Sequence, residues 1–537
     1  MDQTTNGKRC KAGRSFDRRA AMKAAGGAGL ALVAGAAPGI ADRAVLAQEA
    51  TPAASPAASP VAVEPLDSLT IDLSGEPQSL DPALAESPRD WSVVHAIYDS
   101  PLQWGKTGQI EPLAAESFRF VDSTTIEIVL REGLAFHDGA PVTSAAIARA
   151  VAHLQDPDGG SQVTDLFRPI VAVREIDART AHLVTDAPAP GLLAQIVTWL
   201  VLLPDGTTAD SLAKAPVGSG PFIFESYEAG NRIVLRRNPA YTWGSPKGQP
   251  LAERATYRFV PEAATRVADL SSGATDIVVE IPIDQQDQLS SGGGAARDVP
   301  LVGTSFVRLV SDQPPFDNPS VRLAILHAVD VESVAQALVS PNAHRLAALY
   351  PDARAMGFDP SLAPHAFDPE LAKSLLSDAG LGDGLDVDFE ITTAARQDVA
   401  EAIAAQLGEV GIRCTIKALE YTQFNQTWKE GSAPLRMATW SPLYDPSTLL
   451  GLVFAKDGYL SRYTNAEADA LIAQAAAETD VAARTELYQQ LGRVMHDDPA
   501  ALYLWNLTGI YGVSARAGAW TSRGDEIVLP VTGGTAG

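Results

Sequence analysis

Hydrophobic and polar residues alternate along several short stretches of this chain and recur at helical spacing along others. The sharpest alternation runs from Thr125 to Arg131, where Ile126, Ile128 and Leu130 are separated by Glu127 and Val129. A period of two predicts a strand with one face in a core. The sequence therefore predicts a protein that contains β-sheets.

A turn and a helix are predicted directly after this strand. Asp138-Gly139 and Pro141 supply turn chemistry, because Gly tolerates positive φ and Pro fixes the next backbone angle. Thr143 stands where a helix N-cap is expected, before an apolar pattern at helical spacing from Ser144 to Leu154. His137 and Asp138 are adjacent on the turn, and neighbours on a turn rarely converge on one substrate atom, which favours a structural role over a catalytic pair.

The same two periods recur along the rest of the chain. The patterns predict strands at 69–73, 276–279, 306–310 and 500–505, helices at 91–98, 264–272 and 398–407, and a flexible loop at 290–294. Gly273 is placed to end the second of these helices. The fold class predicted by this mixture is α/β.

The N-terminal residues carry the pattern of an export signal. Asp17 to Lys23 contains the twin arginines Arg18-Arg19, a weakly apolar Ala/Gly run follows to Ala41, and small residues end at Ala47. The run is short, rich in Gly and interrupted by Pro38, which disfavours a membrane-spanning helix. Residues 1–47 are therefore expected to be a Tat signal, with its cleavage or retention as an anchor left open. Residues 48–65 read as an Ala/Pro/Ser linker.

Composition narrows the class of partner. A chain of 537 residues exceeds the size at which one hydrophobic core stops growing, so two or more lobes are expected. The formal charge of −24 speaks against nucleic acid or an anionic membrane surface as the main partner, because both attract basic patches.

Motifs of enzymes and metal sites are missing from the sequence. There is no G-x-S-x-G, P-loop, G-x-G-x-x-G after a strand, or H-E-x-x-H, and the eight His residues have no metal-ligand spacing. We therefore expect no catalytic residue, no metal ligand and no cofactor. Two short matches are interpreted as chance: Leu529 to Gly533 is similar to a sortase signal, and Arg523-Gly524-Asp525 to an adhesion motif.

Several groups of residues together resemble the family 5 extracellular solute-binding proteins of ABC importers. The resemblance rests on the following stretches, from about residue 66 to 515: Leu80 to Ala83, Tyr98 to Leu102, Ile110 to Val151 with its F-H-D-G-x-P-V-T, Val217 to Phe222, Arg237 to Tyr241, Pro315 to Ala324, Phe367 to Gly380 and Trp440 to Pro446. It implies a two-lobed periplasmic-binding-protein type II-like fold, in which mixed sheets are flanked by helices and a hinge joins the lobes. The implied division is lobe I at 66–280, lobe II at 281–499, and a return to lobe I with a C-terminal tail at 500–537.

The resemblance also implies where a ligand would bind. Peptide-binding relatives carry an acidic residue that pairs with a peptide amine in the segment matched by Trp440 to Pro446. Here that position is Leu443 or is missing, because the segment is one residue shorter. Asp445 matches a second acid that is expected to shape the turn. The candidate ligand contacts are Trp440, Tyr444, Asp445, Phe306, Tyr98, Trp505 and, for a ligand carboxylate, Arg396. For each, packing in the core or a solvated surface position is the alternative.

The expected function is capture of a small solute between two lobes and its delivery to a membrane permease, outside the cytoplasm. The solute stays open between a peptide, a nickel chelate, a sugar or another molecule. Expected partners are this solute, ABC permease subunits and the Tat machinery, with the protein itself a monomer. The rivals are a ligand sensor or chaperone on the same fold without transport, and a secreted hydrolase.

Overall fold

The computed structural model describes residues 65–161, 163–291, 294–393, 395–430 and 433–532. The predicted export signal and nearly all of the predicted linker lie outside this range. Within the described residues, no helix is both long enough and apolar enough to cross a membrane.

The largest sheet in the described residues has ten strands and mixes parallel with antiparallel pairs. Their order is β14 (Ile412–Leu419), β13 (Leu385–Thr392), β15 (Leu435–Trp440), β12 (Gly294–Leu309), β16 (Ala501–Ser514), β11 (Ile277–Val278), β1 (Leu66–Leu73), β10 (Ala252–Phe259), β9 (Arg232–Arg237) and β8 (Phe222–Glu228). We use lobe I for the part built on β1 to β11 and lobe II for the part built on β13 to β15. The expected mixed sheet is confirmed. The strand predicted at 69–73 falls within β1, and those predicted at 276–279, 306–310 and 500–505 overlap β11, β12 and β16 but extend at least one residue beyond them.

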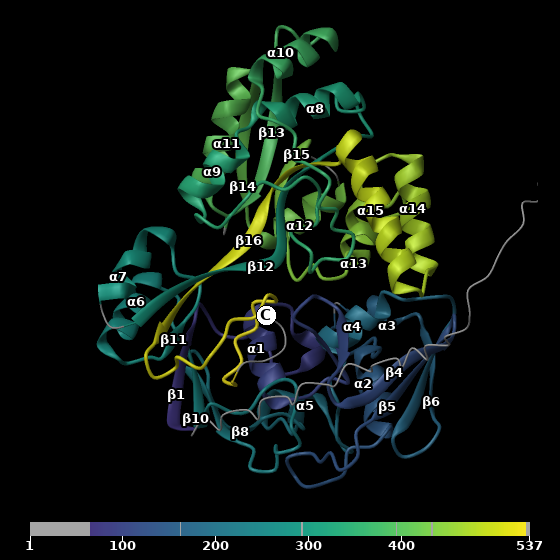
Figure 1. Ribbon diagram of the computed structural model, residues 1–537, viewed down its shortest axis with the longest axis vertical. Coiled ribbons are helices and arrows are strands. Elements are labelled where there is room, and N and C mark those ends of the chain that lie inside the picture. Colours follow the sequence, from purple (N-terminus) through teal and green to yellow (C-terminus); the bar gives the residue numbers. More distant parts are fainter. Residues whose placement is uncertain (1–64, 162, 292–293, 394, 431–432, 533–537) are drawn as a thin grey trace, which may run out of the picture. The chain divides into compact units, whose positions relative to one another are not determined.

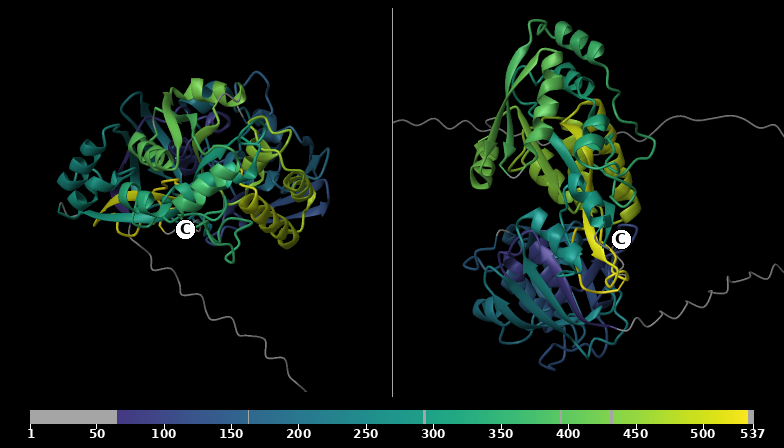
Figure 2. Two further views of the ribbon diagram at one scale, coloured as in Figure 1. Left: turned by 90° about the horizontal axis from the view of Figure 1, so that it is seen from above. Right: turned by 90° about the vertical axis from the view of Figure 1, so that its left-hand side faces the viewer.

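Two long antiparallel strands, β12 and β16, join the lobes (Figures 1 and 2). Gly294 to Pro300 pairs with Thr508 to Ser514 on the lobe I side, and Thr304 to Arg308 pairs with Ala501 to Asn506 on the lobe II side. The register shifts between these two paired stretches, at Pro300 and Thr304 and again before Phe306. An interrupted ladder is a natural place for a strand pair to bend.

Lobe I carries two smaller sheets. One has the order β4 (Ala115–Asp122), β5 (Thr125–Leu130), β7 (Thr180–Thr185) and β6 (Ile170–Glu175), and the other pairs β2 (Leu102–Trp104) with β3 (Ile110–Pro112). The alternation predicted for β5 is confirmed, because Ile126, Ile128 and Leu130 are buried while Glu127 and Val129 are partly exposed. The opening pattern of the sequence is therefore a strand of the scaffold.

The turn after β5 is structural, as predicted. The Asp138 carboxylate accepts the Ala140 N–H at 2.9 Å, and the His137 imidazole bonds to both the N–H of Gly218 and the carbonyl of Gly220. A side chain at Gly220 would lie 2.7 Å from the Ile97 carbonyl group, so the 217–222 turn, to which His137 bonds, packs directly on the end of helix α1 (Pro88–Ile97). Burial lowers the pKa of His137 to about 4, so the ring is neutral at neutral pH.

The predicted N-cap at Thr143 is wrong by one residue. Helix α2 (Ala145–Leu154) begins one residue later than predicted, and Ser144 holds the cap position without a side-chain cap bond. The physical reason is a competing partner: the Ser144 hydroxyl donates to the Asp177 carbonyl at 2.5 Å, and the Ser144 N–H to the Ala178 carbonyl at 2.8 Å. Tertiary contacts with the β6–β7 turn thus replace local capping.

Helices cover the sheets of both lobes (Figure 1). They are α1 (Pro88–Ile97), α2 (Ala145–Leu154), α3 (Thr164–Phe167), α4 (Leu192–Trp199), α5 (Ala209–Lys214), α6 (Ala263–Ser272), α7 (Gln286–Ser291), α8 (Pro319–Ala328), α9 (Val331–Leu338), α10 (Pro369–Asp378), α11 (Gln397–Glu409), α12 (Tyr421–Glu430), α13 (Ser447–Leu449), α14 (Ala466–Ala477) and α15 (Val481–Asp497), with short turns η1 (Pro82–Leu84), η2 (Ile283–Gln285) and η3 (Leu450–Phe454). The predicted helices at 91–98, 264–272 and 398–407 are confirmed. Gly273 ends α6 at φ 77°, as its position predicted.

The loop predicted at 290–294 is only partly present. Residues 290 and 291 end α7, and Gly294 already belongs to β12, while 292–293 lie outside the described residues. The helix forms because Leu289 is fully buried in a small core with Val267, Leu270 and Ile510. Burial of one apolar side chain therefore outweighs the local preference of the Ser/Gly-rich sequence.

Candidate ligand site between the lobes

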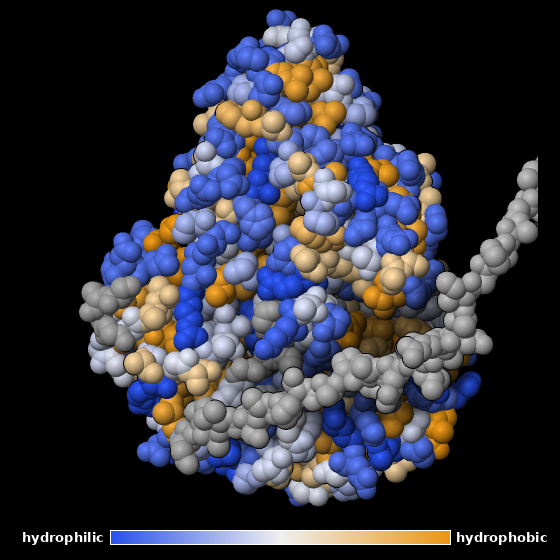
Figure 3. Space-filling model, viewed as in Figure 1, coloured by the Kyte–Doolittle hydropathy of each residue, from blue (hydrophilic) through white to orange (hydrophobic). Residues whose placement is uncertain are grey.

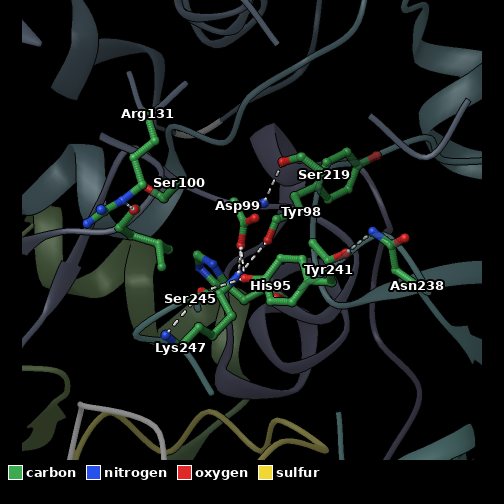
Figure 4. Close-up of polar contacts among 12 residues, drawn as sticks. His95, Tyr98, Asp99, Ser100, Arg131, Ser219, Asn238, Tyr241, Ser245 and Lys247 are labelled. Carbon is green, nitrogen blue, oxygen red and sulfur yellow. Dashed lines mark hydrogen bonds and ion pairs between the residues drawn. The ribbon is translucent and has the colours of Figure 1, made fainter. Parts of the chain in front are cut away.

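Lys247 and Asp99 form a buried ion pair in lobe I (Figure 4). Lys247 Nζ donates to the Asp99 carboxylate at 2.6 Å and to the carbonyl oxygens of His95 and Tyr98 at 2.9 and 2.8 Å. The Tyr241 hydroxyl donates to Asp99 at 3.0 Å. Burial lowers the pKa of Lys247 and raises the pKa of Asp99, and their mutual attraction opposes both shifts. Because all three ammonium protons are used, this cluster is complete without a ligand.

Among the described residues, the lobes also touch outside the strand pair β12–β16, and two contacts are specific. The Trp104 indole of lobe I stacks on the Tyr444 ring of lobe II at 4.6 Å between centroids. On α4 of lobe I, Gln195 Nε2 donates to the Thr448 hydroxyl of lobe II at 2.6 Å. Figure 3 shows a recessed hydrophobic area between the regions of α15 and α4. The two lobes are therefore in direct contact at these points.

The C-terminal segment, residues 523–531, runs between the lobes. Its Gly524 carbonyl accepts the N–H of Val302 on β12 at 2.7 Å, and its Val528 is held by Ser92 and Tyr257 of lobe I at 2.8 Å each. Side chains of this segment alternate between two cavities. Glu526 and Val528 line one, and residues 523, 525, 527 and 529 line the other.

The first cavity, which we call the hinge cavity, has a volume of about 170 Å³. It is lined by the end of β1, the start of α1, residues 279–283 and residues 508–511 of β16, together with Val339 and Arg396 of lobe II. Two cations, Arg89 and Arg396, and two carboxylates, Glu280 and Glu526, belong to its walls. The cavity therefore presents both signs of charge, and both lobes contribute.

Glu280 and Glu526 have an unusual backbone. Their φ angles are 51° and 65°, and they are the non-glycine residues with positive φ among the described residues. Such a conformation costs on the order of 1 kcal/mol or more and clusters at functional sites. Burial raises the pKa of the Glu526 carboxyl, the Ser441 hydroxyl opposes this rise, and the negative charges of Glu280 and Asp525 add to it. Glu280 accepts a hydrogen bond from the Ser74 hydroxyl at 2.7 Å.

The second cavity, which we call the inner cavity, is much smaller, about 30 Å³. It lies against lobe I and is covered by Pro442 of lobe II, and its polar lining residues are His95, Gln103, Trp104, Thr198, Lys247, Arg523 and Asp525. Gln103 and Trp104 are 4% and 5% exposed, and neither the Gln103 amide nor the Trp104 Nε1 has a hydrogen-bond partner among the described residues.

The residues predicted as ligand contacts are distributed over the two lobes, and they do not form one cluster. Tyr98 and Phe306 are fully buried in the core, and Phe306 packs against Phe454 at 5.9 Å between ring centroids. Trp505 is also buried, on β16. Trp440 ends β15, opposite Thr304, and is partly exposed. Of the seven predicted residues, Arg396 alone lines either cavity, where its guanidinium also pairs with Asp398.

The shortened segment from Trp440 to Pro446 forms a turn, and its one carboxylate, Asp445, is paired with Arg484. Leu443 is fully buried, and the Asp445 carboxylate accepts two bonds from Arg484, at 2.7 and 3.1 Å, and the N–H of Ser447 at 2.9 Å. The turn-shaping role predicted for Asp445 is confirmed. Its negative charge is neutralised inside lobe II.

Sequence reasoning missed Glu280, Glu526, Arg89, Gln103 and Trp104. A left-handed glutamate leaves no pattern in a sequence, because positive φ is expected at Gly or Asn. The stretch Arg523-Gly524-Asp525 was the one visible signal, and it is a buried ion pair with bonds of 2.9 and 2.6 Å. Its interpretation as a chance adhesion match agrees with this burial.

The arrangement of two lobes joined by a strand pair, with cavities at their boundary, is that of a solute-binding protein. A family model described as bacterial extracellular solute-binding proteins, family 5 Middle, matches residues 109–460. The chain belongs to this family, and its role is that of the solute-binding component of an ABC importer, which holds a small solute between two lobes.

Similar proteins match most of this chain, and their names state different ligands. The probable D,D-dipeptide-binding periplasmic protein DdpA of Escherichia coli is 26% identical over 83% of this chain and 89% of its own length. The glutathione-binding protein GsiB of Shigella flexneri is 25% identical over 76% and 83%. Among solved structures, NikA of Brucella suis in complex with Fe(III)-EDTA has a TM-score of 0.77 at 22% identity, covering 86% of this chain and 98% of that one. The last comparison supports the two-lobed fold alone.

Proposed function

We propose that the hinge cavity binds the charged groups of a zwitterionic, peptide-like solute. The protonated amine of the solute would lie between Glu280 and Glu526, and a carboxylate would meet Arg396 from lobe II and Arg89 from lobe I. The observation that carries this proposal is the pair of glutamates on strained backbone in one cavity. Repulsion and burial penalise the charge of Glu526, and a bound cation would remove that penalty.

This arrangement would replace the acid that is missing at Leu443. In the peptide-binding pattern the amine partner comes from lobe II, whereas here the two carboxylates come from residue 280 and from the C-terminal segment. The pairing of Asp445 with Arg484 supports this reassignment, because that carboxylate is already neutralised.

We further propose that the chain passes from lobe I to lobe II at 301–303 and returns to lobe I at Leu507, where the β12–β16 register changes. The first of these crossings lies about twenty residues after the predicted one. Closure about this point would bring Arg396 of lobe II toward Glu280 and Glu526. The twin-arginine segment supports export through the Tat system, and the role in import supports an ABC permease as the docking partner.

The test is a thermal-shift series with three related solutes: Ala-Ala, N-acetyl-Ala-Ala and Ala-Ala-amide. A ligand that binds only the folded state stabilises it by RT ln(1 + L/Kd), where L is the free ligand concentration, so at equal concentration a tighter ligand raises the melting temperature more. Ala-Ala should give the largest shift, the N-acetyl form none, and the amide an intermediate one. Equal shifts with Ala-Ala and its N-acetyl form would overturn the amine site, and a shift with metal chelates or oligosaccharides alone would replace the solute class.

A further inference from the structure

The inner cavity contains polar groups that no described residue satisfies. The Gln103 side chain has an unpaired N–H₂ donor and an unpaired carbonyl acceptor, and the Trp104 indole adds an unpaired N–H donor. Both residues are at least nine-tenths buried and line the cavity. A buried polar group without a partner costs roughly 1–3 kcal/mol, so partners from outside the chain are expected here.

The charged residues of the same lining are already compensated. Lys247 uses its three protons on His95, Tyr98 and Asp99, and the Arg523 guanidinium makes two bonds to Asp525. Burial lowers the pKa of His95 to about 3, so that ring is neutral, and its Nε2 bonds to the Thr198 carbonyl at 3.1 Å. The cavity therefore offers hydrogen bonds without net charge.

Lobe II covers this cavity. Pro442 lines it directly, and Tyr444, two residues later, stacks on Trp104. A group that enters while the lobes are apart would be sealed in when they close. The volume of about 30 Å³ suits a single small group.

We propose that the inner cavity is a specificity pocket for a neutral hydrogen-bonding end group of the solute, a carboxamide or a hydroxyl, read by Gln103 with support from Trp104. This inference rests on the proposed function, since it assigns a second contact to the same solute. The Gln103 amide can give and take one hydrogen bond each, which matches a carboxamide and rejects an alkyl group of equal shape.

The first test compares Ala-Asn with Ala-Leu, whose second side chains have nearly the same shape, by calorimetric titration. Wild type should bind Ala-Asn at least tenfold tighter, and Gln103→Leu should abolish that preference. Removal of unpaired polar groups should leave the melting temperature of the unliganded variant unchanged or higher. Equal binding of the two dipeptides by wild type, or a clear drop in the unliganded melting temperature of Gln103→Leu, would overturn the pocket.

A second experiment separates this inference from the amine site. Crystals of the full protein are soaked with acetamide, which has no amine or carboxylate. Acetamide bonded to Gln103 supports the pocket even where Ala-Asn and Ala-Leu both fail to bind, an outcome that would refute the amine site. A water molecule alone at Gln103 in soaked crystals would show that the cavity is a structural water site and would refute the pocket.

Discussion

Two groups of charged residues differ in how their charges are paired within the chain. The Lys247–Asp99 pair is fully buried, and every ammonium proton has a partner within the chain. Glu526 and Glu280 lie at the boundary between the lobes, on strained backbone, with each other's negative charge nearby. The difference separates structure from proposed function: charges paired within the chain hold lobe I together, whereas the carboxylates of the hinge cavity are the proposed contacts of the solute.

The largest expected effect is on the free energy of unfolding, when the buried Lys247–Asp99 pair is broken. Lys247→Met should lower the free energy of unfolding by about 3–5 kcal/mol, because it leaves the Asp99 carboxylate buried without its partner. Urea unfolding followed by tryptophan fluorescence measures this. Lys214→Met is the control, because Lys214 pairs with Asp210 on the surface with both side chains more than 70% exposed, and should cost well under ~1 kcal/mol. Similar losses for the two variants would break the comparison.

Removal of Glu526 should have the opposite effect on stability: the unliganded protein should become more stable, while binding should weaken. Glu526→Gly removes a strained φ of 65° and a partly buried charge, so its free energy of unfolding should rise by about 1 kcal/mol. Binding of Ala-Ala should fall by about ten- to a hundredfold, since a hydrogen bond to a charged group contributes about 1.5–3 kcal/mol. Glu526→Asp keeps the charge and should retain part of the affinity. If the Glu526→Gly variant is less stable than wild type and still binds Ala-Ala, the role of Glu526 is structural and it is not part of the ligand site.

The pH dependence sharpens the same contrast. The pKa of Glu526 in the folded protein is raised above the usual 4.5, so the folded state holds this proton at pH values where the unfolded chain has lost it. Its contribution to stability is therefore present at low pH and is lost as pH rises above about 4.5. As pH rises through this range, the melting temperature of unliganded wild type should fall relative to that of Glu526→Gln. The affinity of wild type for an amine should rise over the same range. Parallel pH profiles for the two proteins would contradict this.

The smallest effect on stability is expected at Arg396. Its pair with Asp398 is about half exposed, so Arg396→Ala should change the free energy of unfolding by less than ~0.5 kcal/mol. Affinity for Ala-Ala should fall about tenfold, because the hinge cavity loses its carboxylate partner from lobe II. Arg413→Ala is the matched control, since Arg413 makes the same exposed two-bond pair with Asp386 on a strand away from both cavities. Equal affinities of the two variants would remove Arg396 from the site.

The scaffold could be predicted from the sequence because its signals are local. The alternation of β5, the Asp138-Gly139 turn and the Gly273 helix end each depend on a few adjacent residues. The two errors, at Thr143 and at 290–294, arose where tertiary contacts of Ser144 and Leu289 outweighed local preference.

The site could be predicted only in part, because it joins residues that are far apart in the chain. Glu280 and Glu526 are separated by nearly half of the sequence, and their conformation is imposed by packing. The aromatic residues Tyr98 and Phe306 lie in the core, as their hydrophobicity alone would favour. Arg396 was predicted because an Arg in the loop before a helix could meet a ligand carboxylate through its planar fork; it lines the hinge cavity, and its role as a ligand contact stays a prediction.

The most direct test of the central claim is native mass spectrometry of protein purified without refolding, with identification of any small molecule that it retains. The account predicts an intact molecule of peptide-like size with a free amine and a carboxylate, lost from Glu526→Gln but retained by Arg413→Ala. A retained anion or sugar without an amine, or retention that is unchanged in Glu526→Gln, would contradict it.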